Sequence, residues 1–243
     1  MIQTIGRWLD YISYVFQSTN RHGIHSPFVY SFTDLILYKP NKPIESIEFQ
    51  RTQMIQSKSD FFGKSLSKFV DEFTLNSKYT SLLYRISLSY KFNKIREWGL
   101  TTGIETNYLL YPLLVELNIP VSYEYRFKSK NPVKTLTNEN LINNYSCEIN
   151  NIDWSENNEG VTLEFINFNE SPDDIWNAID ELKNNSLDNT VVIITNIRHT
   201  DEHYITWRQI CNMEEFNVSI ELFRLGILYF RRGQVKEHFS IRY

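Results

Sequence analysis

Hydrophobic residues in the first ninety positions recur at the three- and four-residue steps of amphipathic helices. The pair Ser26-Pro27 predicts a helix start, because Ser caps helices and Pro fits the first helical position. Prolines at positions 40 and 43 mark the end of that helix. The predicted helices are Ile2–Phe16, Pro27–Leu37, Ile44–Lys58 and Tyr79–Tyr90.

After residue 92, short apolar runs alternate with helical patterns. The predicted strands are Lys94–Trp98, Val121–Tyr125, Tyr145–Ile149, Val161–Asn167, Thr190–Asn196, Val218–Phe223 and Ile227–Arg231. The predicted helices between them are Ile104–Leu117, Pro172–Lys183 and Asp201–Met213. This alternation predicts a mainly parallel sheet with helices on both faces.

The last two predicted strands are joined by Arg224-Leu225-Gly226 alone. So short a link permits only an antiparallel hairpin. We therefore expect an α/β fold with a Rossmann-like, mixed sheet of seven strands, parallel except for the last. Residues 1–90 form a helical extension and residues 91–243 the Rossmann-like domain. The polar segments Lys128–Asn144 and Trp154–Gly160 are expected to be surface excursions.

A glycine-containing loop joins the first predicted strand to the helix after it. Gly99 and Gly103 are spaced Gly-x-x-x-Gly and preceded by Glu97. Gly permits tight turns and close approach of a ligand to the backbone, and the helix N-terminus behind the loop offers free N–H groups. Glu124, at the end of the next strand, stands where such folds bind ribose hydroxyls. The spacing is not Gly-x-Gly-x-x-Gly, so S-adenosylmethionine (SAM) fits better than a nicotinamide cofactor.

Composition and charge limit the kinds of partner that we expect and the cellular compartment that we expect. The net charge of −4 and the pI of about 5.8 give no electrostatic reason to expect nucleic acid. Two distant cysteines predict neither a zinc site nor a disulfide framework, which favours a reducing, cytoplasmic compartment. No run reaches the length of a transmembrane segment. The helix Ile2–Phe16 is expected to dock on its own domain, on a protein partner or on a membrane surface.

Three blocks of the chain resemble a bacterial family of class I SAM-dependent methyltransferase-like proteins. They are Arg21–Tyr30 (RHGIHSPFVY), Glu97–Thr106 (EWGLTTGIET) and a C-terminal block from Val218 to Tyr243 that contains FRLGI and KEHFSIRY. The resemblance covers nearly the whole chain, and its first and last blocks are the most specific. It implies a class I methyltransferase fold and SAM binding by Glu97, Gly99, Gly103 and Glu124.

The chain departs from the family pattern after the fourth and fifth predicted strands. The family carries an Asp-Gly-Asn-His-like tetrad where this chain has Asn167-Phe168-Asn169-Glu170, and an acidic pair where it has Thr195-Asn196. Asn exchanges hydrogen bonds but cannot act as a general base near pH 7. We expect Asn167, Asn169 and Asn196 to line a substrate pocket, and we expect no bound metal.

His199 lies just after the fifth predicted strand, at the edge where ligands bind in such sheets. It is the best candidate for a base if the methyl acceptor is a hydroxyl. A structural role is the competing interpretation of His199 and His203, and Asp201 is expected to cap the next helix. Two functions remain open: a metal-independent SAM-dependent methyltransferase acting on an unknown acceptor, and a catalytically inactive methyltransferase-fold protein that binds a partner.

Overall fold

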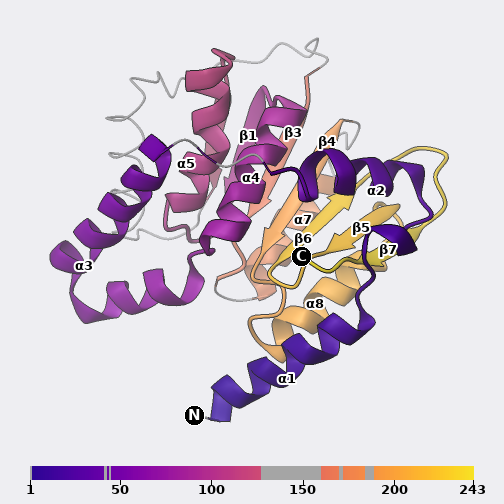
Figure 1. Ribbon diagram of the computed structural model, residues 1–243, viewed down its shortest axis with the longest axis horizontal. Coiled ribbons are helices and arrows are strands. Elements are labelled where there is room, and N and C mark those ends of the chain that lie inside the picture. Colours follow the sequence, from indigo (N-terminus) through magenta and orange to yellow (C-terminus); the bar gives the residue numbers. More distant parts are fainter. Residues whose placement is uncertain (1, 41–42, 44, 127–159, 170–171, 184–188) are drawn as a thin grey trace.

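The computed structural model of the protein describes residues 2–40, 43, 45–126, 160–169, 172–183 and 189–243. Its centre is one seven-stranded sheet with the strand order β2-β1-β3-β4-β6-β5-β7 (Figure 1). The strands are β1 (Lys94–Trp98), β2 (Ser122–Arg126), β3 (Thr162–Ile166), β4 (Thr190–Thr195), β5 (Val218–Glu221), β6 (Leu225–Tyr229) and β7 (Glu237–Ser240). The predicted α/β class and the seven-stranded mixed sheet are confirmed.

The strands of the sheet and their directions differ in part from the prediction. β6 pairs antiparallel with both β4 and β5, whereas every other pairing is parallel. The antiparallel strand is therefore not the last one, because β7 follows it and pairs parallel with β5. The predicted strand Tyr145–Ile149 and the excursion Lys128–Asn144 lie outside the described residues.

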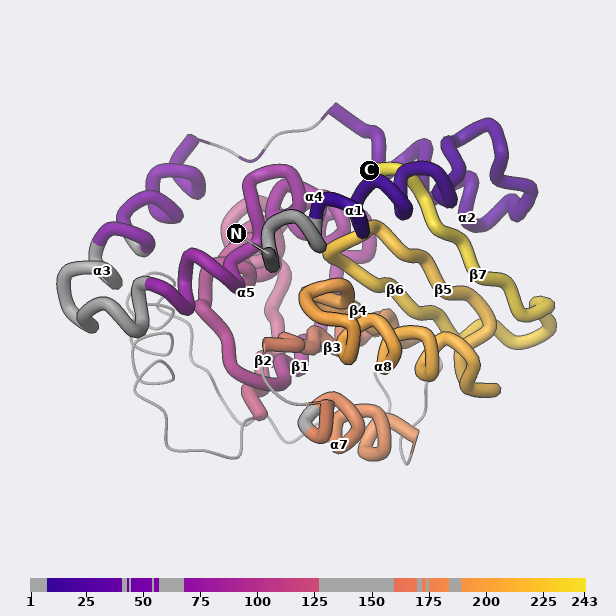
Figure 2. The backbone as a smooth tube through the Cα atoms, turned by 90° about the horizontal axis from the view of Figure 1, so that it is seen from below, coloured from indigo at the N-terminus to yellow at the C-terminus, as the bar shows by residue number. Residues whose placement is uncertain are grey.

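Helices cover both faces of the sheet. Figure 2 shows α7 and α8 on one side and α2, α4 and α5 on the other. The helices after β1 are α5 (Ile104–Tyr111), continued by the π-helical turn η3 (Pro112–Glu116), then α7 (Pro172–Lys183) and α8 (Asp201–Cys211). The central strand β4 is buried along its whole length, which explains its continuous apolar run Val191–Ile194.

The N-terminal region is helical as predicted. Its elements are α1 (Ile2–Gln17), the short 3-10 turn η1 (Arg21–Gly23), α2 (Pro27–Phe32), the π-helical turn η2 (Thr33–Leu37), α3 (Glu45–Phe73) and α4 (Ser77–Tyr90). α3 extends well beyond the predicted end at Lys58, because the polar residues that follow include no proline to stop it. Pro27 holds the first helical position, but the hydroxyl of Ser26 makes no cap and instead accepts a hydrogen bond from Gln234.

The N-terminal helices share one hydrophobic core with the sheet. That core includes Val29 and Leu83 from the helices together with Ile95 and Ile227 from the strands. The backbone at Thr19 bridges to Ile241 beyond β7, so residues from both ends of the chain meet at this edge. In the described part of the chain, no helix is both long and apolar enough to cross a membrane.

Candidate active site

The glycine loop lies between the end of β1 and the start of α5. Gly99 has φ +80° and Gly103 has φ +75°, backbone conformations that favour glycine. A Cβ atom at Gly99 would stand 2.4 Å from the backbone oxygen of Asn167, the residue after β3. Position 99 therefore needs glycine for two reasons, its left-handed backbone and the close approach of the neighbouring strand end.

The carboxylate of Glu97 is fully buried beneath this loop. It accepts hydrogen bonds of 2.7 Å each from Thr106 Oγ1, Tyr123 Oη and Asn167 Nδ2. Burial raises the pKa of Glu97, and these hydrogen bonds together with one from Thr101 oppose that rise. The carboxylate thus joins β1, β2, β3 and α5 at the base of the loop.

The loop is braced by its own threonines and by Glu105 in the first turn of α5. Thr101 Oγ1 accepts a 3.0 Å hydrogen bond from the Gly103 N–H, and Thr102 donates one of 2.7 Å to Glu105. The other oxygen of Glu105 accepts a 2.7 Å hydrogen bond from the backbone N–H of Leu75. The turn between α3 and α4 is therefore fixed directly to the loop, a contact that sequence reasoning missed.

The structure brings the three predicted pocket amides next to this loop. Asn167 bonds Glu97, and Asn169 donates a 2.8 Å hydrogen bond to the backbone oxygen of Leu100. Asn196 donates one of 2.7 Å to Asn169 Oδ1. All three residues are buried, and their role as a substrate pocket stays a prediction.

The C-terminal end of α3 lies on the same edge of the sheet. The backbone oxygen of Phe73 accepts a 3.3 Å hydrogen bond from Asn196 Nδ2, and that of Glu72 accepts one from Arg224. Arg224 also donates to Asn196 Oδ1. No motif predicted the two contacts with α3, because they join residues that are 123 and 152 positions apart in the sequence.

His199 and His203 lie beside the end of α3. His199 Nε2 is 3.2 Å from Glu72 Oε1, and its ring packs against Phe73 with 4.8 Å between centroids. The His203 ring stacks on Phe168 with 3.9 Å between centroids. Burial and the neighbouring His199 lower the pKa of His203 to about 4, so His203 is neutral at physiological pH.

Thr200, and not Asp201, caps α8. Its side-chain oxygen accepts a hydrogen bond from the His203 N–H, and Asp201 occupies the first helical turn. The extended backbone of Thr200 is the conformation that an N-cap requires, which sequence spacing alone did not reveal.

Glu124 is placed differently from the prediction. β2 runs on to Arg126, so Glu124 stands opposite Arg96 in the middle of β1 and not at the strand end. Its carboxylate accepts a 2.7 Å hydrogen bond from Arg126 Nε, and Arg126 also pairs with Glu181 on α7. A role of Glu124 in binding ribose stays a prediction.

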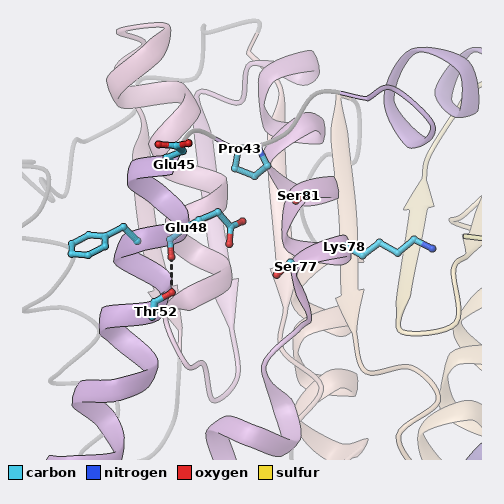
Figure 3. Close-up of a pocket in the computed structure, with 8 residues that line it drawn as sticks. Pro43, Glu45, Glu48, Thr52, Ser77, Lys78 and Ser81 are labelled. Carbon is cyan, nitrogen blue, oxygen red and sulfur yellow. Dashed lines mark hydrogen bonds between the residues drawn. The ribbon is translucent and has the colours of Figure 1, made fainter.

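A separate pocket of about 700 Å³ lies between α3 and α4. Figure 3 shows Glu48 pointing from α3 toward α4, where Ser77 and Ser81 stand, while the Lys78 side chain points away. Residues that line it are Pro43, Glu45, Glu48, Phe49, Thr52, Ser77, Lys78 and Ser81. None of the predicted site residues is among them.

The sequence matches no protein-family model, and no curated protein matches it. Solved structures do match, among them the SAH-bound methyltransferase PaMTH1 of Podospora anserina. The two chains are 8% identical, the TM-score is 0.56, and the match covers 86% of this chain and 97% of that one. Over nearly its whole length, the protein therefore has the fold of a methyltransferase.

Proposed function

We propose that the protein is a SAM-dependent methyltransferase, with SAM bound at the glycine loop by Gly99, Gly103 and Glu124, and with Glu97 holding the shape of the loop. The observation that carries the proposal is the loop itself. Its two left-handed glycines precede the N-terminus of α5 at the carboxyl edge of β1, in a fold shared with a methyltransferase that binds SAH. Backbone N–H groups at such a helix start suit a carboxylate or a hydroxyl-rich ligand.

The four residues predicted to bind SAM differ in how well their surroundings suit that role. Gly99, which is half-buried, and Gly103, which is buried, place no side chain between the loop backbone and a ligand. The carboxylate of Glu97 already accepts hydrogen bonds from protein groups, so we assign it to holding the shape of the loop. Glu124 is partly exposed and paired with Arg126, and binding a ribose would require it to share that partner.

Bound SAM would supply an activated methyl group, and the protein would align the acceptor with it. Asn167, Asn169 and Asn196 would orient the acceptor through hydrogen bonds. For a hydroxyl acceptor, His199 would take the proton while Glu72 orients its ring. An amine or thiolate acceptor would need no base.

We propose that the reaction is independent of metal. Amides stand at the ends of β3 and β4, and they bind divalent cations less tightly than carboxylates do. Addition of EDTA should therefore leave any methyl transfer unchanged. A loss of activity that added Mg²⁺ restores would contradict this part of the proposal.

The test of cofactor binding is calorimetric titration with SAM and with SAH. We expect micromolar affinity for both, and we expect Gly103→Trp to abolish it by placing a large side chain in the proposed SAM site. Gly233→Trp is the matched control, because Gly233 has a similar φ of +77° and no atom within 4 Å of a Cβ placed there. Unchanged binding in Gly103→Trp, with cooperative unfolding retained, would place the site elsewhere.

A second candidate is a catalytically inactive methyltransferase-fold protein that binds a partner. It is favoured by the contacts of Asn196 and His199, which already engage the end of α3. If the purified protein binds neither SAM nor SAH, this function replaces the first. If it binds both, incubation with radiolabelled SAM and a panel of amine, thiol and phenol acceptors tests catalysis.

A further inference from the structure

The helix α1 turns an apolar face outward. Trp8, Leu9, Ile12 and Phe16 follow one another at helical spacing, and they are 65%, 63%, 38% and 85% exposed. Figure 1 shows α1 along the lower edge of the molecule. A surface helix ordinarily buries its apolar stripe, so this orientation requires an explanation.

The opposite side of α1 is held to the protein by specific polar contacts. Asp10 pairs with Arg198 at 2.5 Å, and the buried Tyr14 donates a hydrogen bond from its hydroxyl to the backbone oxygen of Ile241. Arg242 donates a 2.7 Å hydrogen bond to the backbone oxygen of Val15. Rotating α1 to bury its apolar face would break all of these contacts.

We propose that this apolar face packs against the same face of a second copy of the chain, in an antiparallel twofold pair of α1 helices. With aromatic side chains of roughly 150–250 Å² each, the exposed parts of these four residues amount to on the order of 500 Å² per chain. Two copies would then bury about 1,000 Å², which reaches the lower limit of a specific interface. A twofold pair needs a surface that is complementary to itself, and an uncharged apolar stripe meets that requirement.

Charge favours a second copy over a lipid surface. Helices that lie on membranes carry Lys and Arg beside their apolar face. The sequence of α1 has one basic residue, Arg7, and one acidic residue, Asp10, which pairs with Arg198. The net charge of −4 also opposes binding to anionic lipids.

Sedimentation velocity of the full chain over a range of concentrations tests the proposal. We expect a dimer, and we expect Phe16→Asp to raise its dissociation constant at least about 30-fold by placing a charge in the interface. Val235→Asp is the matched control, because Val235 is 79% exposed and lies outside α1. Since Phe16 is 85% exposed, the thermal midpoint of the monomer should stay unchanged, which separates loss of pairing from loss of folding.

Cross-linking tests the orientation of the pair. In an antiparallel pair centred on Ile12, a Cys at position 12 would face its own copy across the twofold axis. A Cys at position 16, on the same face, would stand about 12 Å from its copy, since each residue rises 1.5 Å along the helix. In a Cys147→Ser background, Ile12→Cys should form an intermolecular disulfide and Phe16→Cys should not, whereas a parallel pair would bring both cysteines together; Cys211 is buried.

Three results would overturn the proposal. One is a monomer at every concentration. Another is a dimer that Phe16→Asp leaves intact. The third is a monomer that binds phosphatidylcholine vesicles and loses that binding on Phe16→Asp, which would assign the face to lipid.

Discussion

The side-chain amide of Asn196 donates a 2.7 Å hydrogen bond to the side-chain oxygen of Asn169, joining the end of β4 to the end of β3. The same amide group donates to the backbone of Phe73, and its oxygen accepts from Arg224. Asn196 has φ +55°, a conformation that Asn adopts more readily than most residues. One side chain thus connects two strands of the sheet with the end of α3.

Asn196→Asp should destabilise the fold without abolishing SAM binding. Asp offers no donor, so the oxygens of Asn169 and Phe73 would lose their partner, at a cost of about 1–3 kcal/mol in the free energy of unfolding. SAM affinity should persist, because position 196 is expected to touch the acceptor and not the cofactor. Urea denaturation and calorimetric titration measure the two quantities.

Asn76→Asp is the control for this substitution. Asn76 caps α4, and among the described residues its side chain accepts hydrogen bonds from the N–H groups of Lys78 and Tyr79 and donates none, so Asp should serve there equally well. Loss of SAM binding in Asn196→Asp would instead assign position 196 to the cofactor site.

Gly99→Ala should destabilise the protein more than Gly233→Ala. Both residues have φ near +80°, so both substitutions carry about 1–2 kcal/mol of left-handed strain. Only at position 99 does the new Cβ meet a backbone oxygen, that of Asn167 at 2.4 Å, which adds at least about 1 kcal/mol. Equal losses in urea denaturation would show that the loop can move away from β3.

The contribution of Glu164 to the free energy of unfolding should fall as the pH rises. It is buried in β3, where it pairs with Arg96 and accepts a 2.7 Å hydrogen bond from Trp98 Nε1. Burial outweighs these partners and raises the pKa of Glu164 from 4.5 to about 7. The folded protein therefore binds this proton more tightly than the unfolded chain does. The resulting stabilisation, about 3 kcal/mol, is complete below pH 4.5 and is lost by about pH 7.

Comparison with Glu164→Gln isolates this contribution. The difference in unfolding free energy between wild type and Glu164→Gln should decline between pH 4.5 and 7, and Glu202→Gln, at an exposed position, controls for net charge. The pH dependence of the wild-type free energy of unfolding does not isolate Glu164 by itself. The lowered pKa of His203 also acts on it, because it removes stability as the pH falls from 6.5 toward 4. A difference that stays constant with pH would contradict the prediction.

His199→Ala should lower the rate of methyl transfer to a hydroxyl acceptor by about 10²–10⁴-fold, the usual contribution of a general base. SAM affinity should change little. Glu72→Gln should lower the rate less, because its amide oxygen can still accept from the imidazole. His25→Ala, at an exposed position, is the control. Equal rates for wild type and His199→Ala would leave His199 with a structural role only.

The sequence predicted those elements whose signals are local. Lys94–Trp98 was placed correctly because it leads directly into the glycine loop. Pro172–Lys183 was also correct, since Pro suits a helix start and Lys suits its last turn. β7 was missed because Glu237–Ser240 has no apolar alternation, and its strand conformation comes from pairing with β5.

The sequence by itself determined most of the helices and strands, the glycine loop, and the polar residues at the ends of β3 and β4, because periodicity and turn chemistry are local properties of a chain. Tertiary structure alone decided what those residues contact. Glu105 meets Leu75, Asn196 meets Phe73 and His199 meets Glu72 because the sheet brings strand ends together and α3 ends beside them. It also decided that Glu124 pairs with Arg126 inside a strand, and that α1 faces outward, because register and packing depend on partners remote in sequence.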